Sequence, residues 1–193
     1  MKSPKKVVNH IVDWLIKYSN KSKMNGFVIG ISGGVDSAIV STLCALTNKN
    51  VLCLEMSIHQ NKNEQKRSSD HINWLEKNFP NVRHYKISLS EIFDLFKDKM
   101  TVEIQDNEKQ LLSLANSRAR LRMTTLYYFA SLNNYLVAGT GNKVEDFGVG
   151  FYTKYGDGGV DISPIADLLK TEVYKLAKYL KIIKAIQKAD PTD

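Results

Sequence analysis

The sequence has few of the features that mark secreted, membrane-spanning and cysteine-metal proteins. Its 193 residues include 2 cysteines, Cys44 and Cys53, whose spacing does not match a metal-ligand pattern. No apolar run approaches the roughly 20 residues that a membrane-spanning helix needs. The N-terminal stretch carries basic residues but neither a long apolar core nor a small-residue cleavage site, so it predicts an amphipathic helix and not a signal peptide. We therefore expect a protein of the reducing cytoplasm, with buried free thiols and no membrane partner.

The sequence also shows no internal repeat, low-complexity tract or linker, so residues 1–193 predict one domain. Hydrophobic residues make up 43% and charged residues 24%, which is typical of a globular protein with a sizeable core. The formal net charge of +7 favours anionic partners, either nucleic acid or the phosphates of nucleotides. The lysines are spread along the chain, and no aromatic RNA-binding signature lies between the basic residues. We therefore expect no nucleic-acid partner.

Segments that predict helices alternate with segments that predict buried strands. The predicted helices are 7–19, 36–47, 62–78, 89–100, 108–132 and 170–180. The predicted strands are 26–32, 50–57, 82–88 and 134–140, while 101–107 and 141–169 read as a polar loop and a glycine-rich irregular segment. This alternation is typical of an α/β fold, in which a parallel sheet carries helices on both faces.

One short stretch, residues 31–38 (ISGGVDSA), joins the first predicted strand to the helix that follows it. Ligands of open parallel sheets bind beyond the carboxyl ends of the strands, and the free amides of a helix N-terminus attract phosphate. Gly33 and Gly34 let the backbone approach an anion closely, while Ser32 and Ser37 add hydroxyl donors. Asp36 would repel a phosphate unless a cation lay between them, and Mg²⁺ prefers carboxylate and phosphate oxygens together. The stretch therefore predicts a phosphate loop with a magnesium ligand.

The stretch fits neither the Walker pattern nor the dinucleotide G-x-G-x-x-G. A helix N-cap by Ser32 or Asp36 would explain a lone S-G-G, but the full SGGVDS between a strand and a helix is much more specific. It resembles the pyrophosphate-binding loop of the N-type ATP pyrophosphatases. Those enzymes split ATP into AMP and pyrophosphate while they adenylate a substrate.

Three further stretches narrow the resemblance to one family. They are 116–130 (NSRARLRMTTLYYFA), 139–146 (GTGNKVED) and 150–180, which contains TKYGDGG. Together with GISGGVDS they resemble NAD synthetase, the ligase that amidates nicotinic acid adenine dinucleotide (deamido-NAD) in NAD biosynthesis. The resemblance implies a doubly wound, five-stranded parallel sheet of the adenine-nucleotide hydrolase type, usually in a homodimer.

The resemblance also implies a two-step reaction. ATP with Mg²⁺ adenylates the nicotinate carboxylate and releases pyrophosphate, and ammonia then displaces AMP. Because the synthetase motif begins at residue 30, no N-terminal amidase domain fits, and free ammonia is the expected nitrogen donor. In the family, a mobile segment that covers the site follows the ending IQKADPTD. We therefore expect this chain to lack the family's C-terminal segment and to amidate poorly.

The matching motifs imply site residues at definite positions. The implied ATP contacts are Gly30, Ile31, Ser32, Gly33, Gly34, Val35, Asp36, Ser37, Thr140, Lys170 and Thr192. The implied Mg²⁺ ligands are Asp36 and Glu145, and the implied deamido-NAD contacts are Arg120, Lys154 and Asp161. The segment between Glu145 and Lys154 is one residue longer than in the commoner family form, which leaves its local register open.

Helical spacing gives independent support for Arg120. Ser113, Asn116, Arg120 and Thr124 form one polar stripe on an otherwise apolar helix. Two neighbouring arginines, Arg118 and Arg122, share a different face and are expected to be structural. The histidines are expected at the surface or in caps, and Trp14 and Trp74 in helix packing.

Two alternatives remain open. One is another amidating or thiolating member of the superfamily that acts on GMP precursors, asparagine or tRNA; TKYGDGG and GTGNK argue against it. The other is a non-catalytic or weakly active nucleotide-binding module, which would keep the ATP loop without a second metal ligand. Glu145 argues against this module, whereas the short C-terminus argues for it.

Overall fold

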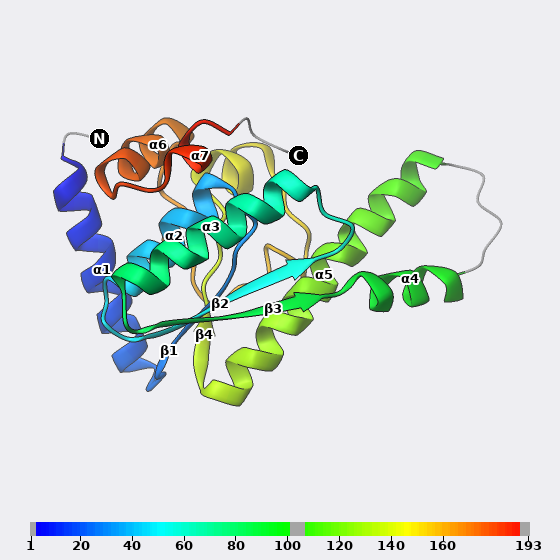
Figure 1. Ribbon diagram of the computed structural model, residues 1–193, viewed down its shortest axis with the longest axis horizontal. Helices are drawn as coiled ribbons and strands as arrows, with labels where there is room; N and C mark the ends of the chain where they lie inside the picture. Colours follow the sequence, from blue (N-terminus) through cyan, green and yellow to red (C-terminus); the bar gives the residue numbers. More distant parts are fainter. Residues whose placement is uncertain (1–2, 101–106, 190–193) are drawn as a thin grey trace.

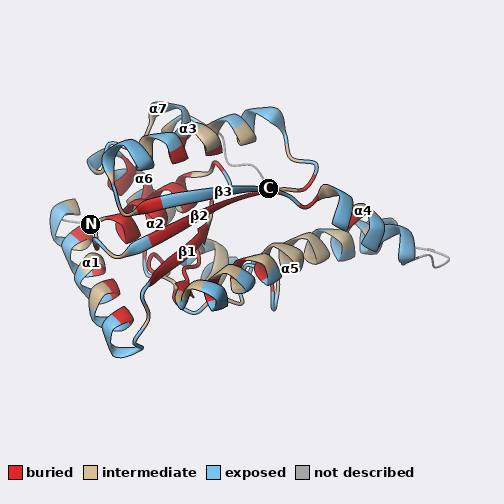
Figure 2. Cartoon of the chain, turned by 60° about the horizontal axis from the view of Figure 1, so that its bottom comes forward, coloured by how far each residue is buried: buried red, intermediate tan, exposed pale blue. Residues whose placement is uncertain are grey.

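A four-stranded parallel sheet forms the centre of the computed structural model, which describes residues 3–100 and 107–189. In the order of the sheet, the strands are β3 (Val82–Ser88), β2 (Asn50–Ser57), β1 (Gly26–Gly30) and β4 (Tyr135–Val137). The register pairs Val28 of β1 with Leu52 of β2 on one side and with Val137 of β4 on the other. Figure 2 shows that the central strands are buried along most of their length.

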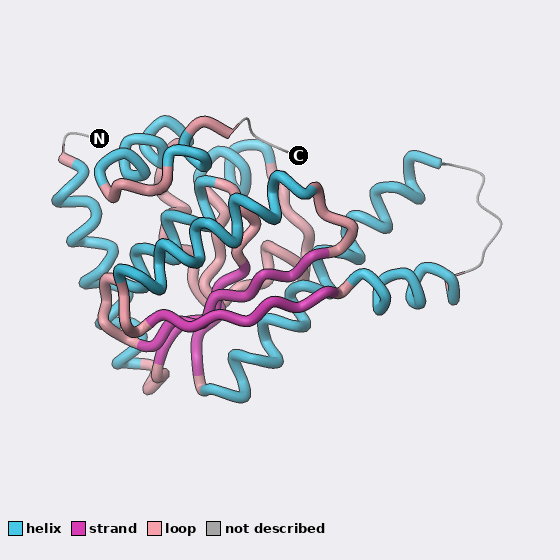
Figure 3. Tube along the Cα trace, viewed as in Figure 1, coloured by secondary structure: helices cyan, strands magenta, loops and turns pink. Residues whose placement is uncertain are grey.

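Helices cover both faces of this sheet, as Figures 1 and 3 show. One face carries α1 (Pro4–Lys21), α2 (Val35–Ala45), α3 (Lys62–Asn78), α6 (Lys170–Tyr179) and the short α7 (Lys184–Gln187). The other face carries α5 (Asn107–Asn133), with α4 (Ser90–Lys99) beyond the end of β3. The alternating side chains of β1 explain the two cores: Phe27 and Ile29 belong to the core that includes α2, whereas Val28 belongs to the core that includes Leu126 of α5. The predicted α/β class is confirmed.

The number of strands differs from the expected five. In the part of the chain that the structure describes, the sheet has four strands, and an isolated parallel bridge between Ala138 and Ile162 extends its β4 edge. Pro164, two residues after Ile162, has no amide to donate and does not suit a longer ladder, and the chain turns from this residue on. The Asp161 carboxylate accepts a hydrogen bond from the backbone amide of Val137 at 2.8 Å, so this amide of β4 has a side-chain partner in place of a strand carbonyl.

Three predicted elements have the bounds that the sequence indicates, namely β2, α3 and β3. Helix α1 starts earlier, at Pro4, because the Ser3 side chain caps it and proline suits the first turn. The packing expected for Trp14 is wrong: the residue is 38% exposed, and its ring lies 5.5 Å from that of Tyr18 on the same helix. The buried face of this helix runs instead through Val8, Ile11, Leu15 and Ser19.

Both cysteines are buried free thiols, as predicted. Burial raises the pKa of Cys53 to about 12, so this thiol stays protonated. The expectation of surface or capping histidines is wrong for His71, which is completely buried between α2 and α3. Its Nε2 lies 3.0 Å from Ser41 Oγ, and burial lowers the pKa of His71 to about 4. No helix in the described ranges is long and apolar enough to cross a membrane.

Helix α4 and the first part of α5 project from the body of the molecule as an arm (Figure 1). Several large apolar side chains on this arm are exposed. They are Ile92, Leu95, Phe96, Leu111 and Leu112. A monomer gains nothing by presenting such a surface to water, so the arm is a candidate contact surface.

Candidate phosphate and metal site

The predicted phosphate loop lies at the carboxyl end of β1, where it leads into α2. Ile31 still donates its amide to Leu54 of β2 at 2.9 Å, so the loop leaves the sheet at Ser32. The Ser32 hydroxyl accepts a hydrogen bond from the Gly34 amide at 3.2 Å and lies 3.1 Å from the Ser37 hydroxyl. Gly34 is the N-cap of α2, so the first free amides of this helix open onto the loop. Residues 30–37 therefore lie at the carboxyl end of β1 and the start of α2, where the sequence predicts a phosphate loop.

Helix α3 holds the loop from outside, which the sequence analysis missed. The carbonyl oxygens of Ile31, Ser32 and Gly33 accept hydrogen bonds from three side chains on or just before α3. These donors are Ser68 Oγ at 3.0 Å, Gln60 Nε2 at 3.1 Å and Arg67 Nε at 3.2 Å. Because the carbonyl and the amide of a trans peptide point in opposite directions, the Gly33 amide faces away from Gln60, which holds the Ser32 carbonyl of the same peptide. Nothing in the local sequence pattern of 60–68 distinguishes these side chains from solvated helix residues.

The two predicted metal ligands meet at a single ammonium group. Lys170 Nζ lies 2.6 Å from Asp36 Oδ2 and 2.8 Å from Glu145 Oε1. Lys170 is the first residue of α6, Asp36 lies in the first turn of α2, and Glu145 follows β4. These three residues come from segments that are far apart in the sequence, and they meet at the carboxyl edge of the sheet.

Asn142 completes this cluster, although the sequence analysis assigned it no role. Its Nδ2 donates to Asp36 Oδ1 at 3.2 Å, and its Oδ1 accepts the amides of Val144 and Glu145. The side chain is fully buried. The side-chain amide of Asn142 therefore caps the segment that carries Glu145 and also orients Asp36. The only sequence signal for this role was the position of Asn142 within GTGNK.

Burial and charge act in opposite directions on this cluster. Burial raises the pKa of Asp36, and the hydrogen bonds from Lys170 and Asn142 oppose that rise. For Lys170, the opposing effect of burial is outweighed by the hydrogen bonds to Asp36 and Glu145, and its pKa is raised. Asp146, another residue that the sequence analysis missed, has its pKa raised to about 6 by burial and then by the nearby charges of Asp157, Glu145 and Asp36.

The segment that carries Glu145 and the predicted extra residue begins with a π-helix. The segment Lys143–Val149 forms this π-helix, and the amide of Gly150 reaches back to the Glu145 carbonyl. A π-turn accommodates one residue more than an α-turn, and such turns are common at functional sites. Gly150 ends the segment with a left-handed φ of 69°, which suits glycine. Glu145 thus lies in the first turn of this π-helix, directly after its Asn142 cap.

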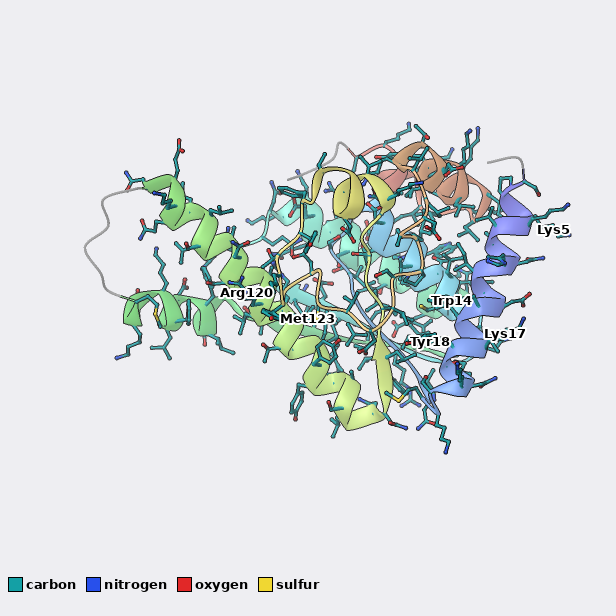
Figure 4. All side chains as sticks on the ribbon, turned by 180° about the vertical axis from the view of Figure 1, so that it is seen from behind. Lys5, Trp14, Lys17, Tyr18, Arg120 and Met123 are labelled. Carbon is teal, nitrogen blue, oxygen red and sulfur yellow. The ribbon has the colours of Figure 1, made fainter. Side chains whose placement is uncertain are left out.

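The polar stripe of α5 partly contacts the TKYGDGG loop. Arg120 Nε donates to the Lys154 carbonyl at 3.1 Å, and Thr153 Oγ1 donates to Asn116 Oδ1 at 2.8 Å. The Thr124 hydroxyl instead bonds back to the Arg120 carbonyl within the helix. Arg120 is exposed and lies near the base of the arm (Figure 4), so its guanidinium remains accessible beside the loop.

The other two implied dinucleotide contacts have different surroundings. The Lys154 ammonium lies over the ring of Tyr155, 5.1 Å from its centroid. Asp161 accepts the Tyr127 hydroxyl at 3.0 Å with one oxygen and the Val137 amide with the other. Burial and the hydrogen bond to Asp161 raise the pKa of Tyr127 to about 12, which keeps this donor protonated.

The remaining residues with a predicted role are two threonines and two arginines. Thr140 lies just beyond β4 at the same edge of the sheet, and Thr192 lies outside the described residues. Arg118 and Arg122 are structural, as expected: the first lies over the Phe93 ring at 5.4 Å, and the second donates to the Met56 carbonyl at 3.1 Å.

Comparison with known proteins gives one consistent result. The family model described as NAD synthase matches residues 7–193. The chain is similar to the NH(3)-dependent NAD(+) synthetase of Mycoplasma genitalium, with 40% identity over 189 residues that cover 97% of this chain and 73% of the relative. It is also similar to the enzyme of the same name from Archaeoglobus fulgidus, with 41% identity, 97% coverage of this chain and 72% of the relative.

Solved structures agree with this result. The structure of NMN synthetase from Francisella tularensis has a TM-score of 0.90 and 34% identity, covering 100% of this chain and 76% of that one. The NH3-dependent NAD synthetase from Campylobacter jejuni, in complex with the nitrate ion, has a TM-score of 0.85 and 34% identity, covering 96% and 77%. Both identities are high enough for the likeness to extend beyond the fold.

Proposed function

Because the chain belongs to the NAD synthase family, we propose that it is an ammonia-dependent NAD⁺ synthetase that amidates deamido-NAD at the expense of ATP. The observation that carries the proposal is the cluster of Asp36, Glu145 and Lys170 beside the free N-terminus of α2. This cluster puts two carboxylates and a cation next to an anion-binding loop, which is what a nucleotide with a bound metal requires.

The reaction needs ATP because a carboxylate is a poor acyl donor. In the first step a nicotinate oxygen attacks the α-phosphorus, and the bond to pyrophosphate breaks. In the second step ammonia attacks the acyl carbon, AMP leaves with the bonding electrons, and a proton is released. The protein supports both steps by holding the reactants and stabilising charge on the departing phosphates.

The loop of residues 30–37 would bind the ATP phosphates. The hydroxyls of Ser32 and Ser37 lie 3.1 Å apart beside the first amides of α2, and α3 fixes the backbone of this loop. Thr140 at the end of β4 and Lys170 at the start of α6 border the same edge and would complete the ATP contacts. The proposed ATP contact of Thr192 rests only on the family resemblance.

Asp36 and Glu145 fit Mg²⁺ by their geometry and chemistry. A single cationic atom already lies within 2.8 Å of an oxygen from each, so one ion can contact both. The described residues contain no group of three or more histidine, cysteine, aspartate or glutamate side chains suited to a metal. Two carboxylates suit Mg²⁺, which keeps several waters and takes substrate phosphates as ligands. When bound, the ion would neutralise the separating pyrophosphate.

Arg120 is the strongest candidate contact for deamido-NAD. Its guanidinium is exposed and fixed at Nε by the Lys154 carbonyl, so its other donors remain for a phosphate or carboxylate. Lys154 adds a second exposed cation on the same loop. Asp161, whose oxygens already accept two hydrogen bonds, would serve this site by fixing the loop against β4 and α5.

A homodimer would explain the exposed apolar arm. In the described part of the chain, α4 and α5 present several exposed apolar side chains, and closed two-fold dimers are the commonest way to cover such a face. Sedimentation analysis should give twice the chain mass, and Leu111→Glu with Leu112→Glu should shift the protein to monomer. A reducing compartment such as the cytoplasm suits the two buried free thiols.

The decisive test is NAD formation from deamido-NAD, ATP, Mg²⁺ and ammonium. Glutamine, in a preparation free of ammonia, should not replace ammonium. Nicotinic acid mononucleotide should be offered in parallel, because one similar structure is that of an NMN synthetase. ATP–pyrophosphate exchange that requires deamido-NAD supports the proposal. Exchange that ignores deamido-NAD points to another member of the superfamily, and binding of ATP without exchange points to a non-catalytic module.

A further inference from the structure

Lys170 lies at a position that its own helix does not favour. It is the first residue of α6, where the helix dipole presents its positive end and a cationic side chain is unfavourable. The ammonium is half-buried, with 28% of the side chain exposed, which adds a cost of desolvation. The two short ion pairs to Asp36 and Glu145 offset both costs and account for its placement.

The same two carboxylates are the proposed metal ligands. Lys170 Nζ donates hydrogen bonds to Asp36 Oδ2 and to Glu145 Oε1. Asn142 Nδ2 donates a hydrogen bond to the other Asp36 oxygen. A divalent cation that enters alone would have to break both ion pairs and leave an ammonium beside itself. A cation that enters with a nucleotide brings phosphate oxygens, which offer the ammonium a new partner.

We propose that Lys170 is an internal counter-cation for the metal site. In the nucleotide-free protein its ammonium holds the two carboxylates together and keeps divalent cations out. When ATP brings the metal, Lys170 passes from the carboxylates to the phosphate oxygens. The metal and the nucleotide therefore bind together. Lys170 weakens metal binding in the nucleotide-free protein and strengthens it when ATP is bound. This inference rests on the proposed function, because it takes Asp36 and Glu145 as ligands.

The test measures Mn²⁺ binding directly, with no catalytic readout. Electron paramagnetic resonance of free Mn²⁺ gives its affinity for the nucleotide-free protein. Lys170→Met, which removes the charge and keeps the length, should bind Mn²⁺ roughly tenfold or more tightly than wild type, because partly buried charges at this distance interact strongly. With a non-hydrolysable ATP analogue present, the effect of the substitution on Mn²⁺ affinity should reverse. Lys170→Met should then bind Mn²⁺ more weakly than wild type.

Two controls keep the result specific. Lys178→Met removes the same charge from an exposed position of α6 and should leave Mn²⁺ affinity unchanged. Adding Asp36→Asn to Lys170→Met should abolish the gain. The proposal is overturned if Lys170→Met binds Mn²⁺ no more tightly than wild type, if Lys178→Met gains as much, or if the sign does not reverse with nucleotide. A gain that survives Asp36→Asn would reject the metal-ligand assignment, whereas failure of NAD formation alone would reject the proposed function.

Discussion

Gly33→Ala should damage the phosphate loop more than any other single-methyl change in it. The backbone of Gly33 has a φ of +86°, which costs an L-residue about 1–2 kcal/mol. The added Cβ would lie 2.6 Å from the Glu64 carbonyl oxygen and 3.2 Å from the Ser68 amide. Both are backbone atoms of α3 that cannot rotate away, so the loop or the helix must shift. We expect a total loss of about 2–4 kcal/mol in the free energy of unfolding.

Urea denaturation followed by far-ultraviolet circular dichroism measures that loss. A matched control is Gly148→Ala in the π-helix, where the added Cβ meets nothing closer than the Lys143 carbonyl oxygen at 3.6 Å. The KM for ATP in pyrophosphate exchange should rise for Gly33→Ala, because the shift displaces the amides and hydroxyls of the loop. Stability and ATP affinity equal to those of Gly148→Ala would refute the close packing of the loop on α3.

Three further outcomes are expected. Asp36→Asn should abolish pyrophosphate exchange while the circular dichroism spectrum stays native, because it keeps the size of the side chain and removes the charge that would hold Mg²⁺. Near-normal exchange would contradict the assignment of Asp36 as a metal ligand. Arg120→Ala should raise the apparent KM for deamido-NAD roughly tenfold to a hundredfold and that for ATP little, since a charged hydrogen bond is worth about 1.5–3 kcal/mol; equal losses would indicate a structural role. His71 has a pKa of about 4 when folded, below its ordinary 6.5, so the unfolded chain binds more protons between these values and stability should fall as pH is lowered from 6.5 to 4. The full effect is at most about 3 kcal/mol, and urea titrations across this window should show a steeper pH dependence for wild type than for His71→Gln.

The sequence predicted those parts of the fold that depend on local periodicity and on the chemistry of single motifs. The bounds of β2, α3 and β3 follow from apolar runs and turn residues, and the ATP loop from its glycines and serines. Asp36 and Glu145 were expected to share an edge because parallel strands end together, and Lys170 bridges them there.

The remaining features depend on tertiary contacts, which no local pattern encodes. Gln60 and Arg67 look like solvated residues until α3 is placed against the phosphate loop. Trp14 reads as a packing residue, yet the core selects the face of Val8 and Leu15 and leaves Trp14 outside. The fifth strand was inferred from the family, but the described residues have in its place a single bridge, beside which the Asp161 carboxylate accepts the Val137 amide.

The wide separation in sequence of the cluster residues has a consequence for folding. Asp36 pairs with Asn142 across 106 positions and with Lys170 across 134. Contacts between such distant segments form late, because the entropy of closing a long loop must be met before they add stability. The loop of residues 30–37 can take its turn early, but its carboxylate acquires Lys170 only after β4 has joined β1 and α6 has docked. During refolding, nucleotide binding should therefore recover with the last phase of tertiary structure and not with the early helical signal.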